Sequence, residues 1–279
     1  MLDIGNVNTL TVVSTQRHEV RFDGGDAGEI LLAEKYVSER YHPGDDVEVF
    51  VYPDRDGQLL AITSKPYATV GQFAKLRVAA TTSSGAFLSW GMKSDLLVPK
   101  SEQLNPMREG ESYVVYVFLS EKTSLITAST KLSKFLGLHP PEYVEDEEVD
   151  LIICNKTDLG YQAVINQSHM GMLFENEVFQ KLFIGQQLKG YIYNLRDDSK
   201  IDLRLQLPGY EKVDGVSQAI IEVLEKNGGT SSLSDKSPPD EIYALFGVSK
   251  KVFKKAIGAL YKKKIISIDR GTGIKLVNK

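Results

Sequence analysis

The sequence predicts a mainly β protein in which three copies of one small barrel precede a helical unit of a different kind. Its clearest signal is a repeated phrase, in which a glycine turn and a polar residue lead into β-branched and aromatic residues. The phrase occurs around Gly44, Gly110 and Gly185, which lie 66 and 75 residues apart. Such a spacing is too long for a solenoid unit and suits a small β-barrel. Beyond about residue 215 the apolar periodicity changes from two residues to 3.6, which predicts helices.

Each repeat contains five strand-like runs with polar or glycine turns between them. In the first repeat these are Thr9–Ser14, Glu19–Phe22, Gly28–Leu32, Asp46–Tyr52 and Leu59–Thr63. In the second they are Phe73–Ala79, Ala86–Trp90, Asp95–Val98, Tyr113–Phe118 and Leu125–Ser129. In the third they are Val149–Asn155, Gly160–Ile165, Gly171–Phe174, Leu188–Tyr193 and Ile201–Leu205. Five strands is the count of an OB-fold barrel.

The carboxy-terminal segment predicts three helices and a β-hairpin. The first helix is expected at Val216–Lys226, and the second starts at Ser237-Pro238-Pro239-Asp240 and runs to about Phe246. Gly247-Val248-Ser249 is expected as a tight turn, with Ser249 as a good N-cap for the third helix, from Lys250 to about Lys263. The hairpin strands are expected at Ile265–Ile268 and Ile274–Val277. This is the order of a winged helix-turn-helix. We expect barrels at 1–66, 67–139 and 146–210 and a winged helix domain at 214–279, with Pro140, Pro141 and an acidic run marking the joint after the second barrel.

Charge is distributed unevenly along the chain. Residues 216–279 carry 12 Lys and Arg against 6 Asp and Glu, although the whole chain has a net charge of −4. This polarity favours a polyanionic partner for the basic end, although a solvated lysine-rich helix face would give the same count. No apolar run approaches the ~20 residues that cross a bilayer. The first residues lack the features of a signal peptide, and the single cysteine, Cys154, suits a reducing compartment, so we expect a cytoplasmic protein with a buried, inert thiol.

Signals for catalysis and for bound cofactors are missing from the sequence. The four histidines have no Cys or carboxylate partner at ligand spacing; they are His18, His42, His139 and His169. There is no Gly-Lys-Ser/Thr phosphate loop and no dinucleotide-binding fingerprint. We therefore expect a non-enzymatic protein without a metal or cofactor.

The second repeat resembles a known domain. Gly85-Ala86-Phe87-Leu88, Leu96-Leu97-Val98-Pro99 and the later Gly110 resemble the S-one type of RNA-binding OB domain. Three such barrels and a winged helix, with Gly28-Glu29-Ile30-Leu31-Leu32 and the lysine-rich phrase at 249–258, resemble the conserved virulence factor B family of bacterial RNA-binding regulators. The resemblance implies single-stranded RNA binding and post-transcriptional or translational regulation rather than catalysis.

Candidate RNA-binding residues follow from this resemblance and from residue chemistry. The domain's strand-two aromatic corresponds to Phe87, with Tyr161 as the nearest equivalent in the third repeat, and Lys200 matches a basic residue at the start of strand five. The first repeat offers only Phe22, so its binding is open. Flat rings stack bases and cations hold phosphates, which gives the full set: Phe73, Lys75, Arg77, Phe87, Trp90, Lys93, Tyr161, His169, Arg196, Lys200 and Arg204. Phe87 and Trp90 differ by three along a strand and are expected on opposite faces, so at most one of them is a stacking platform.

The third helix and the wing supply a second set, expected to contact nucleic-acid phosphates: Lys250, Lys251, Lys254, Lys255, Lys262, Lys263, Lys264 and Arg270.

Two other functions fit the same sequence. One is a DNA-binding regulator that uses the winged helix, and the other is an adaptor that binds proteins of the ribosome or of a transcription complex. The sequence does not give the RNA target or the oligomeric state.

Overall fold

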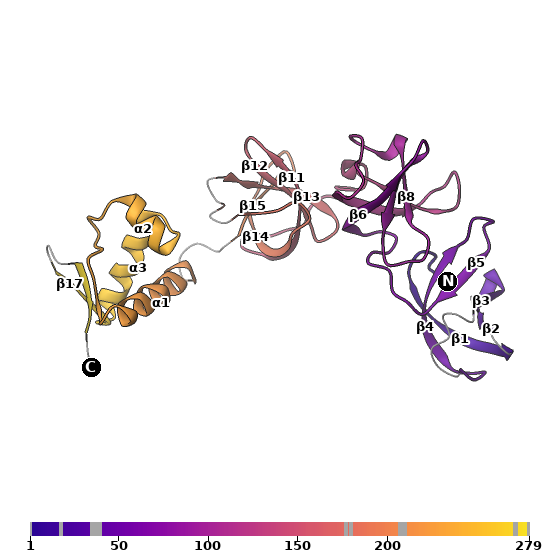
Figure 1. Ribbon diagram of the computed structural model, residues 1–279, viewed down its shortest axis with the longest axis horizontal. Coiled ribbons are helices and arrows are strands. Elements are labelled where there is room, and N and C mark those ends of the chain that lie inside the picture. Colours follow the sequence, from indigo (N-terminus) through magenta and orange to yellow (C-terminus); the bar gives the residue numbers. More distant parts are fainter. Residues whose placement is uncertain are drawn as a thin grey trace.

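The protein consists of three closed five-stranded barrels followed by a winged helix, arranged one after another along the long axis (Figure 1). The computed structural model describes residues 2–16, 19–33, 41–175, 178, 181–205, 211–269 and 273–277. The predicted fold class, mainly β with a winged helix at the carboxy terminus, is confirmed.

All three barrels have the same topology. The first contains β1 (Val7–Gln16), β2 (Glu19–Asp23), β3 (Glu29–Ala33), β4 (Asp46–Pro53) and β5 (Leu59–Ile62). The second contains β6 (Phe73–Thr81), β7 (Gly85–Ser89), β8 (Leu96–Pro99), β9 (Ser112–Leu119) and β10 (Ile126–Ser129). The third contains β11 (Glu148–Thr157), β12 (Gly160–Ile165), β13 (His169–Phe174), β14 (Gln187–Leu195) and β15 (Ile201–Arg204). The third and fifth strands of each barrel pair in parallel and close it. Each expected strand is present, with ends within two residues of the expected positions.

A bulge in the first strand of each barrel fixes which residues correspond. It falls between Val12 and Ser14, between Val78 and Ala80, and between Ile153 and Asn155. The second strand of the later barrels then begins with a glycine. A Cβ on Gly85 would lie 2.2 Å from the Val98 carbonyl oxygen, and one on Gly160 would lie 2.1 Å from that of Leu173. Any side chain here would collide with the neighbouring backbone, so the two glycines occupy equivalent positions.

The first and second barrels share an apolar cluster. Phe50 and Ile62 of the first barrel are 1% exposed and belong to the same cluster as Trp90 of the second. The rings of Phe50 and Trp90 meet edge to face, with centroids 6.0 Å apart. Burial of this kind stabilises the contact by about 1.5–3 kcal/mol for each large side chain.

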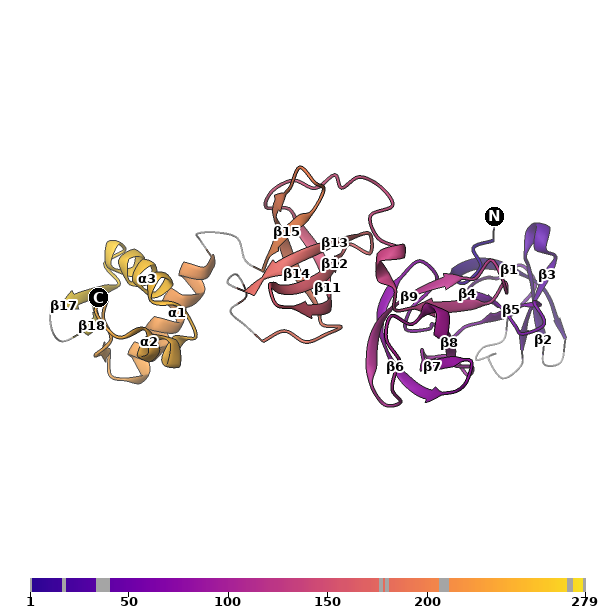
Figure 2. The same cartoon turned by 90° about the horizontal axis from the view of Figure 1, so that it is seen from above.

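A second apolar cluster joins the second barrel to the third. Phe73 and Val114 pack with Ile152 and Val164 of the third barrel and with residues of the connecting segment. The side-chain amide of Gln167, in the turn before β13, accepts from the Phe73 N–H at 2.6 Å and donates to its carbonyl at 3.4 Å. Figures 1 and 2 both show β6 on the side of the second barrel that faces the third.

The winged helix has a core of its own. It contains α1 (Glu211–Lys226), β16 (Thr230–Ser231), α2 (Pro239–Phe246), α3 (Lys250–Lys262), β17 (Ile266–Asp269) and β18 (Gly273–Leu276). Gly247 ends α2 in the left-handed conformation (φ 64°), and the Ser249 side chain caps α3 by accepting from the Val252 N–H, as expected. The described part of the chain contains no helix long and apolar enough to cross a membrane.

Candidate nucleic-acid interface

Phe87 lies on the outer surface of the second barrel. Its neighbours on β7, Ala86 and Leu88, are completely buried in the barrel core, whereas Phe87 is half-buried and points outward. Leu97 on β8 and Ala80 on β6 flank it across the sheet and are also half-buried. The ring therefore lies on a flat apolar patch at the barrel surface, as a stacking platform requires.

Trp90 and Phe73 do not belong to this surface, and their inclusion in the RNA-binding set was wrong. Trp90 is 5% exposed; it packs on Phe50, and its Nε1 donates to the Ser94 carbonyl at 2.7 Å. Phe73 is 2% exposed, and its ring lies 4.7 Å from that of Tyr116 at the contact with the third barrel. Both aromatics are used for packing between barrels, which leaves no open ring face for a base.

The three cations proposed on the second barrel are all exposed. Arg77 and Lys75 project outward from β6, and Lys93 lies in the turn after β7. The Arg77 Nε donates to the Gly110 carbonyl at 3.2 Å, which fixes the side chain along the sheet. Arg77 pairs across β6 and β7 with Ser89, two residues from Phe87 on the same face. The structure thus brings Arg77 and Phe87 onto one surface.

In the third barrel the residue equivalent to Phe87 is Gln162, and not Tyr161. Counting from the matched glycines and bulges, Gln162 pairs with Asn155 as Phe87 pairs with Ala80. Tyr161 instead packs against the barrel core, with the Lys156 Nζ 5.4 Å from its ring centroid. The Gln162 side chain accepts from the Asn155 amide at 3.0 Å. This barrel therefore has a polar amide pair where the second barrel has an aromatic ring.

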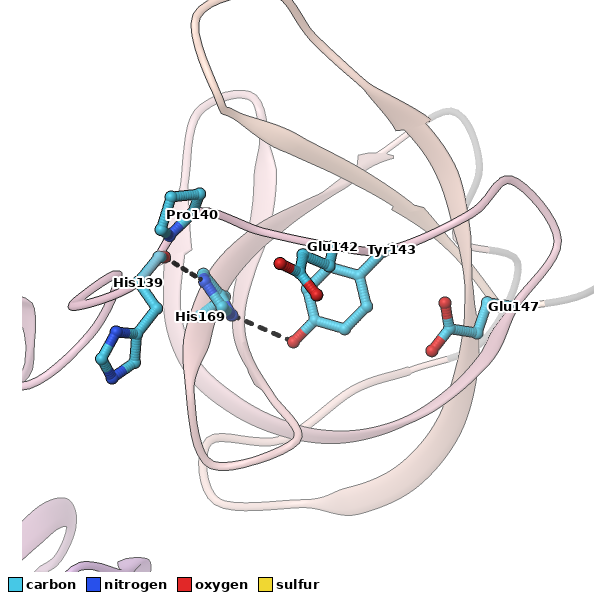
Figure 3. Close-up of a pocket in the computed structure, with 6 residues that line it drawn as sticks. All are labelled: His139, Pro140, Glu142, Tyr143, Glu147 and His169. Atoms are coloured by element: carbon cyan, nitrogen blue, oxygen red, sulfur yellow. Dashed lines mark hydrogen bonds between the residues drawn. The ribbon is translucent and has the colours of Figure 1, made fainter.

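His169 is buried, which excludes the proposed stacking role in an exposed turn. It is 8% exposed, its Nδ1 lies 3.0 Å from the Tyr143 hydroxyl, and its Nε2 lies 2.8 Å from the His139 carbonyl (Figure 3). A carbonyl only accepts, so Nε2 must donate, and in a neutral ring Nδ1 then accepts from Tyr143. His169 ties the segment after the second barrel to the third barrel.

The basic residues of the third barrel differ in availability. Arg204 is 6% exposed, ion-paired with Asp146 and placed over the Tyr193 ring, so it cannot serve as an open phosphate contact. Arg196 is exposed but binds both carboxylate oxygens of Asp202, at 2.9 and 2.8 Å, which raises its pKa. Lys200 is exposed and bonds to Asp198 at 2.6 Å. These two cations reach a phosphate only in competition with their carboxylates.

The first barrel has no aromatic at this position. Phe22 is completely buried in the core, and Arg21 occupies the outward position equivalent to Phe87. The Arg21 guanidinium lies 3.0 Å from Glu29 and 3.7 Å from Glu19, and the hydrogen bond to Glu29 is the main cause of its raised pKa. The flanking carboxylates make this the least suitable of the three surfaces for a polyanion.

The proposed phosphate-contacting lysines of the winged helix lie at its surface. Lys250 is half-buried, and the other six are exposed: Lys251, Lys254, Lys255, Lys262, Lys263 and Lys264. α3 contains no acidic residue. Arg270 lies outside the described residues.

The candidate set from the sequence does not include one exposed aromatic residue, Phe183, which lies beside a lysine. Phe183 is 56% exposed in the turn before β14, with the Lys181 Nζ 5.3 Å from its ring centroid. Its sequence signal is the Lys-Leu-Phe-Ile-Gly run that ends at Gly185, an aromatic beside a cation before a required turn. Over the described residues, no group of three or more His, Cys, Asp or Glu side chains is placed to hold a metal ion.

Family models match the winged helix and the first two barrels. Residues 218–276 match the CvfB-like winged helix domain, and residues 4–64 and 70–131 each match the S1 domain. Both are nucleic-acid-binding types of domain. A crystal structure of a multidomain protein with nucleic acid binding domains from Streptococcus pneumoniae TIGR4 is 23% identical, covers 98% of both chains and has a TM-score of 0.42.

Two relatives that align along nearly the whole chain carry the same name. Conserved virulence factor B of Staphylococcus epidermidis ATCC 12228 is 25% identical over 278 residues, which cover 96% of this chain and 93% of the relative. The protein of that name from Staphylococcus saprophyticus subsp. saprophyticus ATCC 15305 is 23% identical with the same coverage. The matching winged helix, the S1 domains and relatives aligned along nearly the whole chain thus make this protein similar to the conserved virulence factor B family.

Proposed function

We propose that this protein binds single-stranded RNA and acts in the cytoplasm as a non-enzymatic regulator of gene expression after transcription. The observation that carries the proposal is the outward, half-buried ring of Phe87 on an S1 barrel, with Arg77 on the same surface. A base stacked on an aromatic side chain contributes about 1–3 kcal/mol, and every base has a face to offer. Cations beside the ring hold the phosphates.

The second barrel is the principal binding unit in this proposal. Its surface combines a ring with exposed cations, whereas the first barrel places Arg21 between two carboxylates and the third has the Asn155–Gln162 amide pair. Amides can bond to base edges but offer no stacking face. Affinity should therefore depend most on the second barrel.

The lysines of α3 add charge without sequence choice. Lysine is a compact point charge that can contact a guanine edge but lacks the fixed fork of arginine, and adenine is read by Asn or Gln. The α3 sequence contains no Arg, Asn or Gln, so it offers little for reading mixed sequences of duplex DNA. This favours RNA over the DNA-binding alternative. An adaptor for proteins would predict a partner that remains bound after nuclease treatment.

The test compares Phe87→Ala with Phe87→Leu, using a labelled oligouridine and the full chain. If Phe87 stacks a base, alanine weakens binding by about 1–3 kcal/mol. Leucine, which keeps much of the apolar contact on Leu97 but has no ring, should weaken it nearly as much. Thermal melts of both variants separate binding from folding. Wild-type affinity in a folded Phe87→Ala protein would remove Phe87 from the site.

A further inference from the structure

A second basic and aromatic surface lies where the second and third barrels meet. It is formed by Lys75 and Arg77 of β6 and by Lys181 and Phe183 of the third barrel, and we name it the β6 seam. A Cβ on Gly185 would lie 2.2 Å from the Lys75 Cδ, so the Lys75 stem lies directly on the turn that carries Phe183. Residues 104 or more positions apart in sequence are thereby placed on one surface.

The turn that presents Phe183 is held in place. The Phe183 N–H donates to the Gln186 side-chain oxygen at 3.0 Å, and the Phe183 carbonyl accepts from the Gln186 N–H at 3.0 Å. The Gly185 N–H donates to the Ile153 carbonyl at 2.6 Å, with Gly185 at φ 78°. Little ordering is then needed before a base stacks on the exposed ring, which favours binding.

The charge of the seam is positive and unpaired. Lys75, Arg77 and Lys181 form no ion pair with any carboxylate in the described residues. Glu111 follows Gly110, whose carbonyl accepts from Arg77, and its carboxylate is already engaged. It accepts from the Tyr113 hydroxyl at 2.6 Å and lies 3.9 Å from Arg108. The unpaired cations therefore suit a polyanion such as RNA, whose evenly spaced phosphates can contact each of them.

The seam is continuous with the Phe87 surface. Phe87 and Ser89 share a face of β7, Ser89 pairs with Arg77 on β6, and Lys75 lies two residues before Arg77 on the same face. From strand spacings this path is roughly 18 Å from Phe87 to Lys75, before the turn of the third barrel is reached. A stacking ring thus lies at each end, with cations between them.

We propose that one RNA strand stacks on Phe87, crosses β6 along Arg77 and Lys75, and stacks again on Phe183 of the third barrel. This rests on the proposed function and deepens it: the two barrels form one site, whose RNA must be long enough to span the seam. A strand that ends on the second barrel gains nothing from Phe183.

The test measures fluorescence anisotropy of the full chain with two oligouridines. One has about 4 nucleotides, the short end of what a single OB barrel occupies, and the other has about 12, so that it can continue across the seam. Phe183→Ala should weaken the longer RNA by roughly 5- to 150-fold, the equivalent of one lost stack. It should leave the shorter RNA unchanged. Phe183 is exposed, so its truncation should not impair folding, which thermal melts check.

The charges are tested by salt dependence. Lys75→Met keeps the aliphatic contact with Gly185 and removes the charge, and Lys181→Gln removes the other lysine of the seam. Each should lower the slope of log affinity against log salt by about 0.7 for the longer RNA. Phe183→Ala should leave that slope unchanged. Tyr67→Ala, at a ring 72% exposed, and Lys122→Gln, at an exposed turn lysine, serve as matched controls and should behave as wild type.

The outcomes separate the seam from the proposed function. If wild type binds and Phe87→Ala weakens binding, but Phe183→Ala and Lys75→Met match wild type on the longer RNA, the seam proposal is wrong and the function stands. If wild type binds neither oligouridine, the proposed function itself fails.

Discussion

At the scale of single residues, the strand alternation decides which aromatics are available. The period of two places Phe87 and Trp90 on opposite faces, and this much follows from the sequence. Which of them faces the core does not follow, because the Trp90 side is covered by Phe50 of another barrel. Similarly, His169 follows a turn in the sequence, and only the folded chain places Tyr143 and His139 against it.

Position along a strand also explains the difference between Tyr161 and Gln162. Choosing the first aromatic after the glycine selects Tyr161, which follows Gly160 directly, whereas Phe87 lies two residues after Gly85. The same offset of two residues from Gly160 gives Gln162, and the strand register agrees with it. Because side chains alternate between the two faces of a strand, an error of one residue exchanges the outward position for the inward one.

The thiol of Cys154 gives a prediction at this scale. Burial raises the pKa of Cys154 to about 12 from 9.0, and its Sγ lies 3.3 Å from the Gln162 carbonyl. Since the thiolate is the reactive form, native protein at pH 8.5 should be alkylated by iodoacetamide roughly 1,000-fold more slowly than denaturant-unfolded protein. Mass spectrometry over time measures both rates. Comparable rates in the two states would show that the thiol is accessible.

At the scale of elements, strands and helices were predictable because their periodicities are local. The largest difference between a predicted and an observed element is the start of α1, which begins at Glu211 and was expected at Val216. The apolar pattern on which the expectation rested begins only at Val216, and helix residues ahead of the packed face carry no such pattern. By contrast, Gly247 and Ser249 are chemical markers of an end and a start, and both positions were correct.

The lysine face of α3 provides the prediction for an element. Replacing Lys251, Lys254, Lys255 and Lys262 with glutamine retains helix propensity and removes four exposed charges. If all four contact phosphates of single-stranded RNA, the salt slope should fall by about 3 units, with little change in preference among RNA sequences. Binding curves at several salt concentrations across ~50–200 mM give the salt slope of the variant and of wild type. Equal slopes for the variant and wild type would mean that the lysines are only solvated surface.

At the scale of the whole molecule, the number and order of units were predictable and their packing was not. Three repeats and a tail follow from the glycine spacing and the change of period. The contacts between barrels depend on pairs such as Phe73 and Gln167, which are 94 residues apart and carry no shared pattern. The sequence predicted three barrels and their bounds but no contact between them, whereas the structure shows apolar clusters that join the first to the second and the second to the third.

Domain boundaries give a prediction at this scale. We propose that 1–66, 67–139 and 146–210 are structural units, with 214–279 as the only part that folds independently of its neighbours. Fragment 67–139 alone exposes Trp90 and Phe73, so it should be less stable than the same unit within 1–210, by about 3–6 kcal/mol for two uncovered aromatics. A winged-helix fragment that starts at residue 211, so that it keeps all of α1, should retain its stability. Urea unfolding followed by circular dichroism compares the fragments, and an equally stable 67–139 would contradict the shared-core account.

The central claim is that the chain binds single-stranded RNA through its barrels. The most direct measurement is competition for a labelled 12-nucleotide RNA by three unlabelled competitors of matched sequence: single-stranded RNA, single-stranded DNA and duplex DNA. The account predicts that single-stranded RNA competes most strongly and that duplex DNA competes weakly, only through the lysines of α3, and fades as salt rises. Stronger competition by duplex DNA, retained at high salt and reproduced by fragment 211–279 alone, would contradict it.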